Sequence, residues 1–214
     1  MLKIFPVLVT PFMQNCRILS CGSDPRAVVV DPGGDVAEIE AVLKRNGLEC
    51  REIWLTHSHL DHCGGVHVLK ERTGARLFAH PLESEMRQRV KDLCLLYGLP
   101  HGSMEDCPEP EEYISGGETL LLGDLSFQVL FTPGHSPGHV CFYNQPSRTL
   151  LAGDTLFAGS IGRTDLPGGD HQTLLRSIRE SILGLPSDTV VMPGHGPDTT
   201  IGIEKHKNPF LNPG

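Results

Sequence analysis

The run Thr56-His57-Ser58-His59-Leu60-Asp61-His62 directly follows the apolar stretch Ile53-Trp54-Leu55 and constrains the fold more than any other segment. Three histidines and one aspartate fall within six residues, where a buried strand should emerge into a loop. Alternate residues of a strand share a face, so His57 and His59 can point at one ion. Asp61 and His62 come one turn later, where the loop should curl into a helix. The spacing favours a metal site over a His-rich surface loop.

Imidazole nitrogens and carboxylate oxygens are the ligand atoms of this run, and no thiolate is among them. Such a set suits zinc, iron or manganese and does not separate the three metals.

Three other strand-like stretches end in a comparable way. Residues 129–131 are followed by Thr132-Pro133-Gly134-His135, residues 150–152 by Gly153-Asp154, and residues 190–192 by Pro193-Gly194-His195. Pro and Gly at these points end a strand and let the backbone turn sharply. Because α/β proteins place their sites where strand carboxyl ends converge, we expect these residues to join the 57–62 run.

The composition and charge of the chain argue against several classes of partner. The chain has 214 residues, of which 39% are hydrophobic and 21% charged, so it can bury a sizeable core. The formal net charge of −8 argues against a nucleic-acid partner and makes an RNA-processing nuclease the least favoured reading. No apolar run approaches the roughly 18 residues that span a bilayer, so no membrane partner is expected.

The seven cysteines form no C-x-x-C pair, and their number is odd. Several lie inside apolar patterns. We interpret them as reduced, mostly buried thiols, which predicts a cytoplasmic protein.

Apolar periodicity predicts alternating strands and helices in a single domain of residues 1–214. Asp35 should cap a first helix with Glu38 as its capping-box partner, and Asp170 should cap a later one. A helix from Pro81 should carry an apolar stripe from Leu82 to Tyr97. Residues 98–118 should be a surface excursion and the end of the chain a polar tail. The strands are expected at 4–9, 16–21, 26–31, 52–56, 75–79, 119–122, 125–132, 139–143, 149–152 and 188–192.

Taken together, these motifs resemble the metallo-β-lactamase superfamily and, within it, the compact glyoxalase II-like hydrolases. The resemblance covers nearly the whole chain, and its motifs appear in the family's order. It implies an α/β fold, an αββα sandwich with the metals at one edge of the two sheets. Full-length glyoxalase II enzymes carry a helical C-terminal domain, which this chain is too short to contain.

The resemblance also implies two metal sites. His57, His59 and His135 would hold the first ion, Asp61, His62 and His195 the second, and Asp154 would bridge them. The cofactors would be two divalent ions, zinc first and iron or manganese as alternatives. Two such ions can bring the pKa of a shared water toward neutrality and stabilise the oxyanion formed on attack. Asp61 would also orient the bridging hydroxide.

The activity implied is hydrolysis of a small-molecule thioester such as S-D-lactoylglutathione, a glutathione conjugate. Arg163 is the expected cation for a substrate carboxylate, because its planar fork suits that partner. A structural loop arginine is the competing interpretation.

Several alternatives stay open. A mono-iron persulfide dioxygenase shares the run Gly162-Arg163-Thr164-Asp165. Lactonase, phosphodiesterase and β-lactam hydrolysis use the same metal core. A structural metal site in a binding protein is a further option, although seven His/Asp ligands exceed what one closed site needs.

The remaining histidines receive structural interpretations. We expect His139 to make a hydrogen bond within its turn and His171 to start a helix. The others, in the core or on the surface, are His67, His80, His101 and His206.

Overall fold

The computed structural model describes residues 1–100 and 102–212, and the chain forms two compact units. The first unit comprises residues 1–114 and 121–125, and the second comprises residues 115–120 and those from 126 onward. A six-stranded mixed sheet lies in the first unit, and a second six-stranded mixed sheet belongs mainly to the second unit. His101 lies outside the described residues.

The first sheet has the order β1-β2-β3-β4-β5-β6. β1 to β3 are antiparallel neighbours, whereas β3 to β6 run parallel and are joined through helices. The strands are β1 (Leu2–Val9), β2 (Gln14–Cys21), β3 (Arg26–Val30), β4 (Glu49–Trp54), β5 (Arg76–Ala79) and β6 (Glu112–Tyr113). The strands expected from residue 4 to residue 79 are therefore confirmed, with ends that differ by a few residues.

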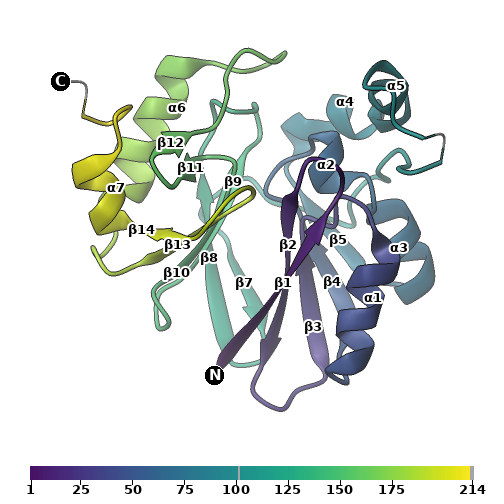
Figure 1. Cartoon of the computed structure of the whole chain (residues 1–214). Helices are drawn as coiled ribbons and strands as arrows, with labels where there is room; N and C mark the ends of the chain where they lie inside the picture. The colour runs from purple at the N-terminus through teal and green to yellow at the C-terminus, as the bar shows by residue number, and fades with distance from the viewer. Residues whose placement is uncertain (101, 213–214) are drawn as a thin grey trace. The chain divides into compact units, whose positions relative to one another are not determined.

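Helices α1 (Val36–Arg45) and α3 (Val66–Thr73) lie against one face of this sheet (Figure 1). Ile39 and Leu43 of α1 and Leu69 of α3 pack in one core with Ile53 and Leu77 of the sheet. A single helical turn, α2 (Leu60–Cys63), precedes α3. The turn confirms that the metal run curls into a helix after its second histidine.

The predicted cap of α1 is wrong in its hydrogen bond. Asp35 has a left-handed backbone (φ 46°), and its side chain makes no capping bond. Its carboxylate instead accepts from the backbone N–H of Thr10 over 2.6 Å. The cap was misjudged because this partner comes from the β1–β2 turn, which is distant in sequence.

The single helix predicted from Pro81 is also wrong. The segment divides into η1 (Pro81–Glu83), α4 (Ser84–Arg87) and α5 (Val90–Leu96). Leu82 and Tyr97, the ends of the expected stripe, are exposed. The break accompanies a fully buried Arg87, whose guanidinium donates to the carbonyl of His80 and pairs with Glu109.

Residues 98–118 are more than a surface excursion. Met104, Cys107 and Ile114 are buried, and β6 adds an edge strand to the first sheet. The core therefore receives side chains from a segment without periodicity.

The second sheet has the order β14-β13-β10-β9-β8-β7. β8, β9 and β10 are antiparallel neighbours, and β10 pairs with β13 in parallel. β8, β10 and β13 therefore end at the same edge. The strands are β7 (Thr119–Leu122), β8 (Leu125–Phe131), β9 (Val140–Asn144), β10 (Thr149–Gly153), β13 (Val190–Pro193) and β14 (Thr199–Thr200), with a separate hairpin of β11 (Leu156–Phe157) and β12 (Ser160–Ile161).

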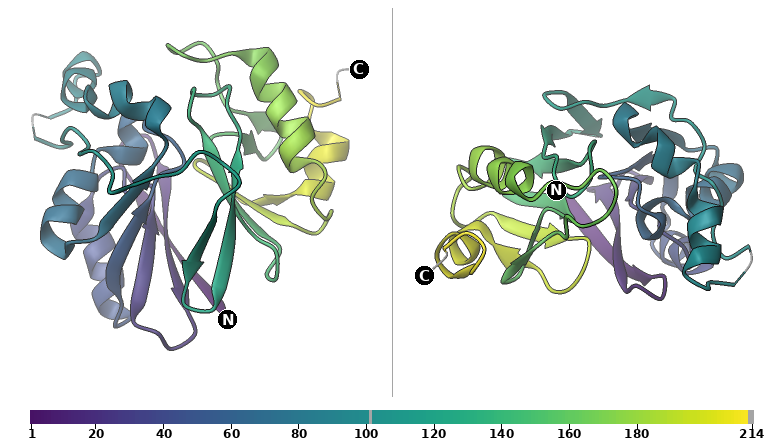
Figure 2. Two further views of the ribbon diagram at one scale, coloured as in Figure 1. Left: turned by 180° about the vertical axis from the view of Figure 1, so that it is seen from behind. Right: turned by 90° about the horizontal axis from the view of Figure 1, so that it is seen from above.

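Helices α6 (His171–Ser177) and α7 (Ile201–Lys207) lie side by side against the second sheet (Figures 1 and 2). Asp170 caps α6 as predicted, its carboxylate accepting from the N–H of Thr173 over 2.6 Å. Leu174 and Ile201 pack with Val191 in this core. The expected polar tail is wrong, since it forms β14 and α7. These elements contain few apolar residues, so they show no apolar periodicity.

Candidate metal centre

The first unit gathers His57, His59, Asp61 and His62 at the carboxyl end of β4. The strand ends at Trp54, and the two flanking histidines of the H-x-H pattern follow in an extended stretch. α2 then carries Asp61 and His62 on successive positions of its single turn. His57 and His62 are buried, whereas His59 and Asp61 are half-buried. These four predicted residues are therefore neighbours.

The two histidines His57 and His59 face each other through ring nitrogens. Nε2 of His57 and Nδ1 of His59 lie 3.1 Å apart. Nδ1 of His57 lies 3.0 Å from the hydroxyl of Thr56, which itself donates to the carboxylate of Asp31 over 2.7 Å. Because that hydroxyl has used its proton, Nδ1 of His57 is the donor to it, and Nε2 is left as an acceptor.

Asp31 is a functional residue that the sequence reasoning missed. It is buried, and its carboxylate accepts from the N–H and hydroxyl of Thr56 and from Nδ1–H of His62. The bond to His62 spans 3.0 Å and fixes the tautomer whose Nε2 bears no proton. Asp31 has a left-handed backbone (φ 52°), which is rare for a non-glycine residue. In the sequence, the segment Asp31-Pro32-Gly33-Gly34 indicates only a turn.

Glycine is required where this turn meets α2. A Cβ on Gly33 would lie 1.5 Å from the carbonyl oxygen of Asp61. A Cβ on Gly65 would lie 2.6 Å from the carbonyl oxygen of Pro32. The turn after β3 and the ligand helix therefore touch backbone to backbone, which no larger residue permits.

Two buried side chains, those of Glu83 and Cys63, hold the backbone of the loop between His57 and His59. Glu83 accepts from the N–H of Ser58 over 2.9 Å, so a fully buried carboxylate holds the residue between the two histidines. Cys63 packs under the loop, with its thiol donating to the carbonyl of Ser58. Burial, reinforced by Cys107 and Asp61, raises the pKa of Cys63, which keeps the thiol protonated.

The second unit gathers His135, Asp154 and His195. They follow β8, β10 and β13, whose carboxyl ends share one edge, as the recurrence predicted. Oδ2 of Asp154 lies 3.6 Å from Nε2 of His135 and 3.5 Å from Nε2 of His195. One carboxylate oxygen thus lies near a nitrogen of each histidine.

The orientation of His135 is set by the segment that follows β12. Its Nδ1–H donates to the carbonyl of Arg163 over 2.8 Å, which leaves Nε2 as the acceptor. A Cβ on Gly162 would lie 1.9 Å from the carbonyl oxygen of Asp154 and 3.1 Å from Nδ1 of His135. The Gly-Arg pair at 162–163 therefore fits closely against two candidate ligands.

Arg163 itself points outward. Its side chain is 59% exposed and forms a two-bond ion pair with Asp165, both bonds being 2.7 Å. Hydrogen bonding from this guanidinium lowers the pKa of Asp165 to about 2. A substrate carboxylate at Arg163 would therefore compete with Asp165.

The other histidines take structural places. His171 is the first residue of α6, as expected, while His67 is half-buried and His206 exposed. His80 is buried, and its ring accepts from the N–H of Leu82 over 3.1 Å. His139 is fully buried, and its Nδ1 bonds the hydroxyl of Thr132 within its own turn, as expected. Its Nε2 also accepts from the backbone N–H of Asp154.

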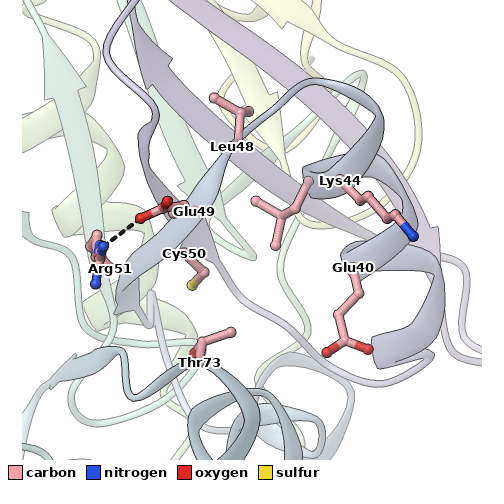
Figure 3. A pocket seen from close by; sticks show the side chains of 8 residues that line it. Glu40, Lys44, Leu48, Glu49, Cys50, Arg51 and Thr73 are labelled. Atoms are coloured by element: carbon pink, nitrogen blue, oxygen red, sulfur yellow. Dashed lines mark hydrogen bonds and ion pairs between the residues drawn. The ribbon is translucent and has the colours of Figure 1, made fainter.

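An open hollow of about 430 Å³ lies elsewhere in the first unit (Figure 3). It is formed by the end of α1, the start of β4 and the end of α3. Cys50 and Thr73 line its floor, and Glu49 pairs with Arg51 at its rim. The hollow lies at the amino end of β4, whereas the ligand residues follow its carboxyl end, so it is separate from the candidate centre.

The donor set fits divalent metal ions. Two nitrogens bound to one tetrahedral zinc ion at about 2.0–2.1 Å are roughly 3.3 Å apart, close to the 3.1 Å between His57 and His59. The partners of His57, His62 and His135 each leave Nε2 as the acceptor. A hydrogen-bonded second nitrogen is the usual arrangement of metal-bound histidine.

Two mixed sheets with His/Asp clusters after their strands define a metallo-β-lactamase fold, and the chain belongs to the metallo-β-lactamase superfamily. The model of this family matches residues 9–195. The structure is similar to that of the BLEG-1 B3 metallo-β-lactamase, with a TM-score of 0.89 and 39% identity over 99% of this chain and 100% of that one. The expected α/β fold is therefore confirmed.

Two further relatives bear on the chemistry. The hydroxyacylglutathione hydrolase GloC of Haemophilus influenzae is 37% identical over 99% of this chain and 98% of its own length. TTHA1623, solved in a di-iron-bound form, has a TM-score of 0.88 and 39% identity over 97% of this chain and all of that one. The protein is a metallohydrolase of the superfamily with His/Asp metal-binding clusters.

Within residues 1–100 and 102–212, no helix is long and apolar enough to cross a membrane. All seven cysteines are buried free thiols, as predicted.

Proposed function

We propose that the protein is a dinuclear metallohydrolase that cleaves a small-molecule thioester such as S-D-lactoylglutathione. The observation that carries the proposal is the complete set of seven ligand-type residues in a chain that is 37% identical to a hydroxyacylglutathione hydrolase along nearly its whole length. The free thiols favour a reducing compartment, so the proposal includes a cytoplasmic location.

In this proposal the two clusters act as one centre. His57, His59 and His135 would hold one ion, Asp61, His62 and His195 would hold the second, and Asp154 would serve both. Zinc is the first choice, and the di-iron form of TTHA1623 makes iron a serious alternative. The hydrogen bonds at Nδ1 of His57, His62 and His135 support it, because each leaves an unprotonated Nε2 as the acceptor.

The bound ions supply two effects, a lowered pKa of water and polarisation of the thioester carbonyl. The chain supplies orientation. Asp61, half-buried beside His62, accepts a hydrogen bond from the attacking water and turns it toward the carbonyl carbon. Arg163 binds a carboxylate of the substrate by exchanging it for Asp165.

The test combines metal analysis of the isolated protein with turnover of S-D-lactoylglutathione. We expect two ions per chain and release of glutathione. His59→Ala should abolish turnover while leaving the circular dichroism spectrum nearly unchanged. One bound ion together with no hydrolysis would contradict the proposal.

The same preparation tests the persulfide dioxygenase alternative. That reaction needs one iron with open positions for O₂ and a sulfur. The run Gly162-Arg163-Thr164-Asp165 motivates this alternative, and the complete second ligand set disfavours it. Oxygen consumption with glutathione persulfide would reverse the order of the two. Lactone and β-lactam substrates belong in the same panel, because the fold serves them all.

A further inference from the structure

His139 is a fully buried imidazole directly before β9, and neither metal cluster includes it. It lies at the edge of the second sheet where β8 and β10 end. Its ring centroid is 6.0 Å from that of His135, with the rings nearly perpendicular. A buried histidine in this place needs an account of both its nitrogens.

Nε2 of His139 accepts a hydrogen bond from the backbone N–H of Asp154 over 3.0 Å. A backbone amide can only donate, so Nε2 carries no proton. Nδ1 lies 2.9 Å from the hydroxyl of Thr132 and 3.1 Å from that of Thr155. The neutral ring therefore carries its proton on Nδ1 and donates it to a threonine hydroxyl.

The ring is held on all sides by a closed polar network. The carbonyl of His139 accepts from the N–H of Thr132 over 2.9 Å. The thiol of Cys141 lies 3.3 Å from the hydroxyl of Thr132 and 3.5 Å from that of Thr155. Each of these residues is buried, so no water competes for the bonds. The ring cannot rotate without leaving buried groups unsatisfied.

Asp154 directly follows β10, at the point where the pairing of this strand ends. The register with β13 shifts between Leu151 and Gly153, and Gly153 has a left-handed backbone (φ 48°). The N–H of Asp154, directly after this shift, donates to Nε2 of His139. The carboxylate that follows lies within 3.6 Å of a nitrogen on His135 and on His195.

We infer that His139 is a positioning residue that fixes the backbone of Asp154 and thereby places its carboxylate as the shared metal ligand. The inference rests on the proposed dinuclear centre. It assigns His139 no contact with substrate or metal. The competing role is a structural one, in which the imidazole only satisfies buried polar groups.

Three variants separate the two roles. His139→Leu removes both ring nitrogens. His139→Gln keeps an acceptor, because its side-chain oxygen reaches about as far as Nε2. Asn144→Ala is the matched control, since Asn144 is a buried residue at the far end of β9 whose side chain donates to the carbonyl of Ser126 over 2.9 Å.

The readout is Zn²⁺ affinity and stoichiometry, measured by competition with a chromophoric chelator, alongside the melting temperature. We expect His139→Leu to weaken Zn²⁺ binding by about 10–100-fold, as loss of a supporting contact does elsewhere. His139→Gln should restore most of that affinity. Asn144→Ala should lower the melting temperature with no change in Zn²⁺ affinity. Unchanged affinity in His139→Leu, or an equal loss in Asn144→Ala, would overturn the inference.

Two further measurements keep the outcome decisive. Long-range ¹H–¹⁵N spectra of the unaltered protein should show His139 protonated on Nδ1, and protonation on Nε2 would overturn the inference even if His139→Leu fails to fold. Asp154→Asn tests the ligand itself and should weaken Zn²⁺ binding at least as much as His139→Leu does. If the unaltered chain binds two ions but does not cleave S-D-lactoylglutathione, the proposed substrate fails while the role of His139 is judged on metal binding alone.

Discussion

Nδ1–H of His62 donates to the carboxylate of Asp31 over 3.0 Å, inside a turn that forces Asp31 into a left-handed backbone. The same carboxylate accepts two bonds from Thr56. Through the hydroxyl of Thr56 it also determines which nitrogen of His57 carries the proton, because Nδ1–H of His57 donates to that hydroxyl. One buried carboxylate thus sets the tautomers of two candidate ligands before any ion is bound.

Asp31→Asn should therefore damage both metal binding and stability. The carboxylate of Asp31 accepts hydrogen bonds from three donors. In the Asn variant, an amide N–H₂ group replaces one of its oxygens, so a donor faces a donor and that hydrogen bond is lost. We expect metal affinity to fall by about 10–100-fold. The free energy of unfolding of the metal-free protein should fall by about 1–3 kcal/mol. Chelator competition and urea unfolding measure the two effects.

The control for this variant is Asp24→Asn. Asp24 pairs with Arg26 at the surface of the same unit, and the substitution changes the charge equally. Its metal affinity should equal that of the unaltered chain. If Asp31→Asn binds metal as tightly as the control does, Asp31 does not orient the ligands.

Gly33→Ala tests the close contact under the ligand helix. The added Cβ would fall 1.5 Å from the carbonyl oxygen of Asp61, so the backbone of α2 must move. We expect a loss of about 3 kcal/mol in the free energy of unfolding, together with weaker metal binding. Gly184→Ala is the matched control because nothing lies within 4 Å of its added Cβ, and it should change stability by less than about 1 kcal/mol. Equal effects in the two variants would refute the contact.

Glu109 makes the stability of the first unit depend on acid. Desolvation works to raise the pKa of this carboxyl, but hydrogen bonds from Ser84, Tyr113, Arg87 and Gln88 outweigh it and lower the pKa from 4.5 to about 2. A lowered pKa stabilises the folded state above the unfolded value. That contribution should be lost as the pH falls from about 4.5 toward 2.

Glu109→Gln should consequently cost about 1–2 kcal/mol at neutral pH, an amount reduced because the side chain is half-exposed. The difference from the unaltered protein should shrink as the pH falls, since protonation removes the same charge. Urea midpoints at a series of pH values measure this. Glu180→Gln, on an exposed helical position, should leave the curve unchanged. A difference for Glu109→Gln that does not vary with pH would contradict the argument.

The sequence points to the candidate ligands because the signal for them is local. A buried strand, a Pro or Gly break and a ligand-type side chain recur at His135, Asp154 and His195, and the H-x-H-x-D-H run carries its own spacing. Whether all seven meet at one centre stays a prediction, as do the single domain and the role of Arg163.

The supporting residues could not be found in this way because their partners are distant in sequence. Asp31 bonds His62 across 31 positions, and His139 bonds Asp154 across 15. Asp35 looked like a helix cap and bonds Thr10 instead. The prediction of a single helix from Pro81 was wrong for the same reason, since the buried Arg87 bonds Glu109 across 22 positions.

Removal of metal by a chelator separates a catalytic centre from a structural one. Each unit has its own apolar core, and the rings of His57, His62 and His135 keep protein partners at Nδ1. We therefore expect the metal-free chain to stay folded, with an unchanged far-ultraviolet circular dichroism spectrum and no turnover.

Bound ions should also raise the stability of the folded chain. Free ions at about 100 times their dissociation constant add about 2.7 kcal/mol to the free energy of unfolding. Their loss should lower the melting temperature by several degrees, at about 2–4 °C per kcal/mol. Returning Zn²⁺ or Fe²⁺ should restore both turnover and melting temperature, and the ion that restores more turnover identifies the metal the reaction uses. Unfolding on chelation would instead indicate a structural metal site, because the two cores would then have failed to hold the chain together without the ions.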